Sequence, residues 1–316
     1  MTIMVPTYPL GYLTQNGIAP PMIALTVALA VFVGISLGLL GGGGSILTVP
    51  LLAYVAGLEP KPAIATSLLV VGVTSAVGAI THARAGRVRW KVAAVFGAAA
   101  MGGAYAGGRL AHLVPGNVLL IAFSLIMIAA AVAMLRGRRD IADESAGPLP
   151  IARIVLQGAV VGMISGLVGA GGGFLLVPAL ALLGGLPMPV AVGTSLVVIS
   201  MQSFAGFAGH LSGEVIDWKL AGMVTAAAVV GSVIGGRLTS YVEAATLRKA
   251  FGWFVLAMAA LVLAEEANIW LGLAVGIVAA IAGGMAFMCA HYARCPLRKI
   301  LVDPGVIPRR VPLPQR

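Results

Sequence analysis

The chain has 316 residues, of which 60% are hydrophobic and only 9% are charged. Soluble domains carry about 25% charged residues, so this composition excludes a water-soluble globular protein and indicates a polytopic membrane protein. The formal net charge of +10 does not indicate nucleic-acid binding, because the basic residues lie between apolar runs, where they set membrane orientation.

Apolar runs alternate with short polar loops along the chain, so we expect an all-α membrane protein. The expected parts are an uncharged tail at 1–21, a membrane repeat at 22–136, a polar cytoplasmic linker at 137–152, a second repeat at 153–264, an additional transmembrane helix at 265–290, and a basic, Pro-rich cytoplasmic tail at 291–316. In each repeat a long run cut by glycines precedes three further spans. The tail at 1–21 lacks the basic region of a signal peptide.

One segment occurs twice without a gap. Gly38–Pro50 (GLLGGGGSILTVP) returns as Gly166–Pro178 (GLVGAGGGFLLVP), so the offset is 128 residues. The same offset relates many other positions, including Thr66-Ser67 to Thr194-Ser195, Ser75 to Ser203, His82 to His210, and Arg109 to Arg237. A duplicated unit broken by glycines in an apolar chain is typical of secondary transporters with the site between two halves.

Loop charges indicate the orientation of the halves. If the first run of each repeat is a hairpin, loops 83–91, 136–153 and 237–249 and the C-terminal tail share one side and hold most of the 20 Lys and Arg residues. The positive-inside bias then places these loops in the cytoplasm. Each half has an odd number of full spans, so we expect inverted repeats, with the N-terminus outside and the C-terminus inside.

The glycine tracts Gly41–Gly44 and Gly169–Gly173 predict breaks in the membrane helices, because each glycine costs a helix about 1 kcal/mol relative to alanine. A helix that starts after a break has unpaired N–H groups and a partial positive charge, which suit a small anion. We therefore expect a substrate site formed by two sets of backbone donors: Gly43, Gly44 and Ser45, and Gly172, Gly173 and Phe174. Close helix packing at the glycines is the alternative.

Hydroxyl groups follow each tract. Thr66, Ser67, Thr194 and Ser195 are candidates to donate hydrogen bonds to the anion, although such hydroxyls also bond to their own helix. Ser75, Gln202 and Ser203 lie about two turns further along and are candidates to line the site or pore.

Two histidines and two arginines complete the candidate set. His82 and His210 end their spans and suit either pH sensing or an interfacial position with a partly hydrated ring, which we favour. Arg109 and Arg237 suit anion sensing, but at span ends arginine more often extends to the lipid headgroups.

Several chemistries lack support in the sequence. No Asp or Glu falls in the middle of a span, which disfavours a cation site or proton relay. No Lys-Ser/Thr follows the glycines, so a phosphate-binding loop is not indicated. Cys289 and Cys295 lack a metal-site spacing, and we interpret them as reduced thiols near the membrane. We therefore expect no enzyme activity, no cofactor and no metal.

The two glycine–proline segments, together with Ala-x-x-Thr-Ser and Gly-Gly-Arg-Leu, resemble the sulfite exporter TauE/SafE family over about residues 22–264. The resemblance implies a bacterial inner-membrane permease of eight or nine spans for sulfite, organosulfonates or related sulfur-containing or organic anions.

We therefore interpret the chain as a secondary transporter of a small anion, working by alternating access between two repeats. Its expected partners are the anion and the lipid bilayer, and assembly into a homo-oligomer is left open. A passive anion channel and a non-transporting membrane assembly protein are the alternatives. The sequence indicates neither the cargo's identity nor the transport direction or coupling ion.

Overall fold

The computed structural model describes residues 20–40, 43–135, 151–169, 171–173, 176, 188–211, 213–238, 244–267, 270 and 272–277. All regular elements in these ranges are helical, which confirms the expected all-α class. Four helical stretches are long and apolar enough to cross a membrane: Met22–Leu39, Pro60–Arg84, Val190–His210 and Trp218–Leu238. Residues 1–19 of the predicted N-terminal tail, residues 137–150 of the predicted linker and the C-terminal tail, with Cys289 and Cys295, lie outside the described residues. Residues 20–21 of the predicted tail instead begin α1, and residues 151–152 of the predicted linker begin α6.

The first half opens with α1 (Pro20–Leu40), followed by a short helical segment of changing pitch. This segment comprises the 3₁₀ turn η2 (Gly43–Leu47), α2 (Thr48–Pro50) and the π-turn η3 (Leu51–Val55). Pro50 has no N–H, and the helix widens directly after it, so that the N–H of Ala56 donates to the carbonyl of Leu51 at 3.0 Å. The segment 43–55 packs back against α1.

Three long helices complete the first half: α3 (Pro60–Arg84), α4 (Trp90–Ala111) and α5 (Gly116–Leu135). α3 begins with Pro60, which suits the first position of a helix because that N–H needs no partner there.

The second half has helices at corresponding positions: α6 (Ile151–Val168), α8 (Met188–His210), α9 (Trp218–Leu238) and α10 (Ala244–Glu266). Asp217 caps α9, where its Oδ1 accepts from the N–H groups of Lys219 and Leu220 at 3.0 Å. After α10, the helical residues 272–277 turn back, with Gly272 against Ala264.

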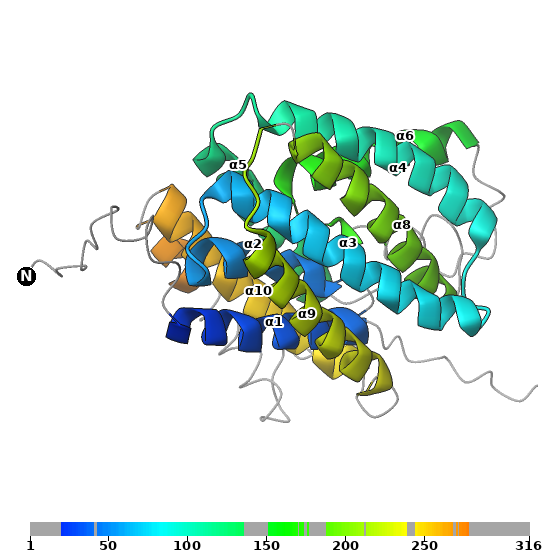
Figure 1. Ribbon diagram of the computed structural model, residues 1–316, viewed down its shortest axis with the longest axis horizontal. Helices are drawn as coiled ribbons and strands as arrows, with labels where there is room; N and C mark the ends of the chain where they lie inside the picture. Colours follow the sequence, from blue (N-terminus) through cyan, green and yellow to red (C-terminus); the bar gives the residue numbers. More distant parts are fainter. Residues whose placement is uncertain are drawn as a thin grey trace, which may run out of the picture.

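The helices of the two halves interleave (Figure 1). α1 packs on α9, α4 on α6 and on α8, α3 on α8, and α5 on α10. α3 and α8 are antiparallel, since Gly72 lies against Phe204 whereas Gly78 lies against Leu196. The antiparallel pair α3 and α8 brings the middles of two apolar spans together, and the candidate site lies beside this crossing.

Candidate functional site

Glycines allow the two halves to approach at backbone distance. A Cβ added at any of eight glycines would overlap a carbonyl oxygen of the facing helix. The pairs are Gly34 with Ala228, Gly38 with Ser232, Gly231 with Val31, Gly235 with Ile35, Gly162 with Ala100, Gly166 with Ala104, Gly103 with Ala159, and Gly107 with Met163. Gly107 and Gly235 are the first glycines of the two Gly-Gly-Arg-Leu motifs, so this position of the motif allows close helix packing.

Both glycine tracts coincide with helix ends. α1 ends at Leu40 and η2 starts at Gly43, whereas α6 ends at Val168. In the second tract Gly169, Gly171 and Gly172 have left-handed φ values of 78°, 62° and 64°, which glycine adopts without strain. A new helical turn starts there, with the N–H of Leu176 donating to the carbonyl of Gly172 at 3.0 Å.

The two breaks meet inside the bundle. A Cβ built on Gly171 would lie 3.4 Å from the Cβ of Ser45. Ser45, Gly44, Gly172 and Gly173 are all buried. Phe174, the sixth residue expected at this point, lies outside the described residues.

The predicted hydroxyls of Ser67 and Thr194 are already used by the protein. Ser67 Oγ lies 2.7 Å from the carbonyl oxygen of Ile64 and 2.8 Å from that of Gly169, which ties α3 to the second break. Thr194 Oγ1 accepts from the N–H of Arg89 at 3.1 Å, at the start of α4 and away from the breaks. Ser195 Oγ donates to the carbonyl of Val192, and Thr66 is buried. In this conformation, therefore, Ser67 and Thr194 bind backbone groups rather than a ligand.

A second group of polar residues lies at the crossing of α3 and α8. The Nε2 of Gln202 donates to the carbonyl of Gly171 at 2.7 Å and lies 3.4 Å from Ser165 Oγ. Gln202, Ser75 and Ser203 are fully buried.

Four buried side-chain oxygens have no hydrogen-bond partner within the described part of the chain: Thr48 Oγ1 in α2, Ser75 Oγ in α3, and Ser203 Oγ and Gln202 Oε1 in α8. Gln202 contacts Gly171, Thr48 follows Ser45 by three residues, and Ser75 lies one turn after Val71, which faces Gly171. A buried polar group without a partner costs about 1–3 kcal/mol, so a cluster of them indicates a place where a ligand supplies the missing bonds. The sequence pattern indicated Ser75, Gln202 and Ser203, but not Thr48 or Ser165.

The buried polar side chains of the described residues are hydroxyls, one amide and one imidazole, with no carboxylate among them. The described residues also contain no group of three His, Cys, Asp or Glu side chains that would hold a metal ion. This centre therefore offers neutral hydrogen-bonding groups and helix starts, which favours an anionic or neutral ligand.

The predicted histidines and arginines lie in the last turns of their helices: His82 in α3, Arg109 in α4, His210 in α8 and Arg237 in α9. His210 is fully buried, so our expectation of a partly hydrated ring is wrong for it; its Nε2 lies 2.9 Å from the carbonyl oxygen of Gly166. Its ring also contacts that of His112, at a centroid distance of 5.8 Å. His112 does not stand out in the sequence, because the residue 128 positions later is Ser240 rather than a histidine. Arg109 and Arg237 are exposed in the last turns of α4 and α9.

Apolar helices long enough to span a membrane, packed around buried, uncharged polar residues, are typical of membrane transport proteins. The profile described as "Sulfite exporter TauE/SafE" matches residues 26–262. The chain belongs to this family, which is one of membrane permeases rather than of enzymes.

Curated relatives agree with this class. A probable membrane transporter protein of Xylella fastidiosa is 34% identical over 242 residues, covering 74% of this chain and 92% of the relative. Another of Bacillus subtilis is 25% identical, covering 72% and 94%, and one of Methanocaldococcus jannaschii is 30% identical, covering 60% and 73%. No solved structure gives a significant match.

Proposed function

We propose that this protein is a secondary transporter that moves a small anion across the bacterial inner membrane by alternating access between two inverted repeats. The observations that carry the proposal are the unpartnered buried oxygens of α2, α3 and α8 and the meeting of the two helix breaks, which Gln202 contacts through Gly171. Family membership supports the transporter class; the cargo and the mechanism are our inference.

Reciprocal contacts support the inverted repeat. Gly34 faces Ala228, and the residues 128 positions away, Gly162 and Ala100, face each other in the same way. The eight closest of these helix-to-helix glycine contacts all form such pairs, which is the pattern that a pseudo-two-fold axis produces. The equivalent helices α3 and α8 are antiparallel, so this axis lies across them and the halves have opposite orientations.

The proposed substrate site consists of the backbone N–H groups of Gly43, Gly44, Ser45, Gly172 and Gly173, with the side chains of Ser75, Gln202 and Ser203 in place of the occupied hydroxyls of Ser67 and Thr194. Phe174, Thr66 and Ser195 stay candidates from the sequence. Ser75 and Ser203 donate to the anion, while Gln202 Oε1 accepts. Because these three side chains are fully buried, loading requires one half to move against the other.

The donors and the acceptor together favour an oxyanion that retains one proton, or an organic anion with a hydroxyl. Hydrogen sulfite fits this description, and so does a small organosulfonate with a hydroxyl group. The described residues include no buried carboxylate that could balance the charge of a bound cation.

Charge at the ends of the bundle supports the proposed orientation. Arg84, Arg87, Arg89 and Lys91 lie around the loop between α3 and α4. At the other end of these helices, Lys61 Nζ donates to the carbonyl of His112, and His112 Nδ1 lies 3.8 Å from Glu214 Oε1. The positive-inside bias assigns the arginine-rich end to the cytoplasm. The N-terminus of α1 then lies on the outer side, because α1 is parallel to α9, which starts near Glu214.

The test is uptake of radiolabelled sulfite by proteoliposomes that contain the purified full chain, with sulfate, thiosulfate and sulfoacetate as competitors. We expect saturable uptake that at least one sulfur-containing anion inhibits. Uptake equal to that of protein-free liposomes for every labelled anion would refute the proposal. Deleting residues 291–316 distinguishes a transporter from an assembly protein that docks through this tail. A transporter lacking the tail should still take up the labelled anion.

A further inference from the structure

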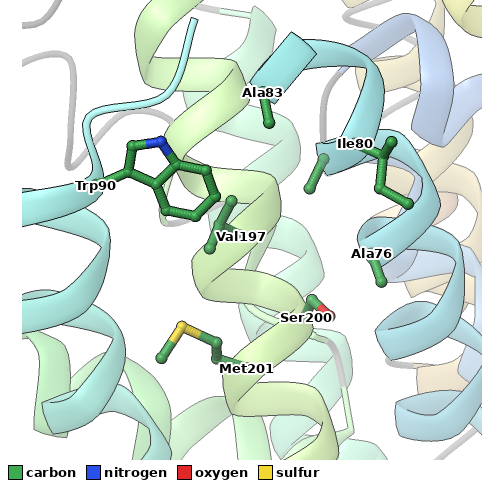
Figure 2. Close-up of a pocket in the computed structure, with 8 residues that line it drawn as sticks. Ala76, Ile80, Ala83, Trp90, Val197, Ser200 and Met201 are labelled. Atoms are coloured by element: carbon green, nitrogen blue, oxygen red, sulfur yellow. The ribbon is translucent and has the colours of Figure 1, made fainter. Parts of the chain in front are cut away.

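A groove of about 230 Å³ lies between α3, α8 and the start of α4, apart from the proposed substrate site. Figure 2 shows the indole of Trp90 at one end, with Ala76, Ile80 and Ala83 on one wall and Val197, Ser200 and Met201 on the other. Trp90 is 61% exposed and Ile80 is 50% exposed. α3 is long and apolar enough to cross a membrane, so an open apolar groove on its surface suits contact with lipid.

The corresponding place in the second half carries two phenylalanine rings where the groove has alanine methyl groups. The residues 128 positions after Ala76 and Ala79 are Phe204 and Phe207. Phe204 packs on Gly72, and Phe207 makes an edge-to-face contact with Trp218 at a ring-centroid distance of 6.2 Å. The groove thus depends on two alanines on one side of an otherwise reciprocal bundle.

The two equivalent places also differ in the charge of the residues that precede their tryptophans. Arg84, Arg87 and Arg89 precede Trp90, and all three are exposed. None of them forms an ion pair with another residue in the described ranges. The residues at the corresponding positions before Trp218 are Ser212, Val215 and Asp217. The groove therefore has three arginines near Trp90, whereas the equivalent place in the second half has an aspartate beside Trp218.

We propose that this groove is a binding site for an anionic phospholipid. One acyl chain lies along Ala76, Ala79 and Val197, the indole of Trp90 packs at the interface, and the headgroup phosphate pairs with Arg84, Arg87 and Arg89. Aromatic residues favour the membrane interface, and arginine binds phosphate through paired hydrogen bonds. The bare surface charge attracts anionic lipid, and the groove selects a chain over a water-soluble phosphate.

Tryptophan quenching by brominated lipids tests the site. Two full-length proteins in liposomes each retain one tryptophan, either Trp90 or Trp218, with the other three replaced by phenylalanine. These two side chains have matched exposures, 61% and 62%. The probes are dibrominated phosphatidylglycerol and dibrominated phosphatidylcholine. We expect phosphatidylglycerol to be preferred at Trp90 by at least about fivefold, the effect of one basic residue near a charged membrane, with no preference at Trp218.

Equal quenching by the two lipids at Trp90 would overturn the proposal, and so would an equal preference at both tryptophans. The triple change Arg84→Gln, Arg87→Gln, Arg89→Gln alters only exposed side chains, and it should abolish the preference. An unchanged preference would contradict the headgroup contact.

The acyl-chain contact has its own test. Ala76→Phe with Ala79→Phe introduces the two phenylalanines of the second half and should reduce quenching of Trp90 by phosphatidylglycerol. In the unsubstituted groove, glycerol 1-phosphate at millimolar concentration should not displace the lipid, because it has no chain. Displacement by this soluble phosphate, which can be measured even where the phenylalanine protein does not fold, would contradict the chain contact.

Discussion

Replacing Ser75 and Ser203 with alanine separates ligand binding from folding. Both hydroxyls are fully buried and have no partner within the described residues. Removing them takes no hydrogen bond from the protein in this conformation and relieves two unpaired polar groups. We therefore expect the apparent melting temperature of the ligand-free protein to stay the same or to rise.

The effect on substrate affinity is the opposite. A hydrogen bond to a charged group contributes about 1.5–3 kcal/mol, so each lost hydroxyl raises the dissociation constant of the anion by about 10- to 100-fold. Ser67→Ala is the matched control, because the hydroxyl of Ser67 bonds to the carbonyl of Gly169 at 2.8 Å. We expect this variant to lower the melting temperature.

The assay is a sulfite titration of the melting temperature of each purified protein, with the KM for uptake measured in liposomes. A bound ligand stabilises the folded state according to its concentration relative to the dissociation constant. We expect the stabilisation curve of the Ser75→Ala, Ser203→Ala protein to shift to at least about 100-fold higher sulfite. A KM within twofold of the unsubstituted protein would refute a role of these hydroxyls in substrate binding.

Four further substitutions test the helix packing, the second helix break and a hydrogen bond at the start of α4. A Cβ at Gly103 would overlap a carbonyl of the facing helix, whereas a Cβ at its neighbour Gly102 would meet nothing. Gly103→Ala should therefore lower the free energy of unfolding by about 1–3 kcal/mol, and Gly102→Ala should raise it by up to about 1 kcal/mol. Denaturant titrations measure both changes. Gly172→Ala should lower the melting temperature, because φ is 64° and the Cβ would overlap the amide of Gln202. Thr194→Val should cost about 1 kcal/mol by removing the acceptor of the N–H of Arg89, and an unchanged unfolding midpoint would contradict the 3.1 Å contact.

The helices were largely predictable from the sequence, because apolar length and glycine tracts act locally. The sequence is predominantly apolar over about 63–82, 90–112 and 190–210, and the helices α3, α4 and α8 lie at these places. The irregular pitch around Pro50 was not predicted, since a π-turn depends on how the chain accommodates the missing N–H.

The buried polar residues of the proposed site were indicated only in part by the sequence. Repetition drew attention to Ser75 and Ser203, but it did not distinguish them from Ser67, whose hydroxyl is taken by Gly169 of the other half. Such partners come from tertiary packing, which no spacing in the sequence reveals. The sequence has alanine at position 76 and phenylalanine at the equivalent position 204. Only the structure shows that Ala76 lines a groove whereas Phe204 packs on Gly72 of the neighbouring helix.

Solute counterflow tests the central proposal most directly. Proteoliposomes preloaded with unlabelled sulfite are diluted into a trace of labelled sulfite, and internal label is followed in time. An alternating-access site that exchanges one anion for another predicts a transient accumulation of label above equilibrium, which the Ser75→Ala, Ser203→Ala protein should lose at the same concentrations. A monotonic rise to equilibrium would indicate a passive channel, and it would contradict a site that opens to only one side at a time.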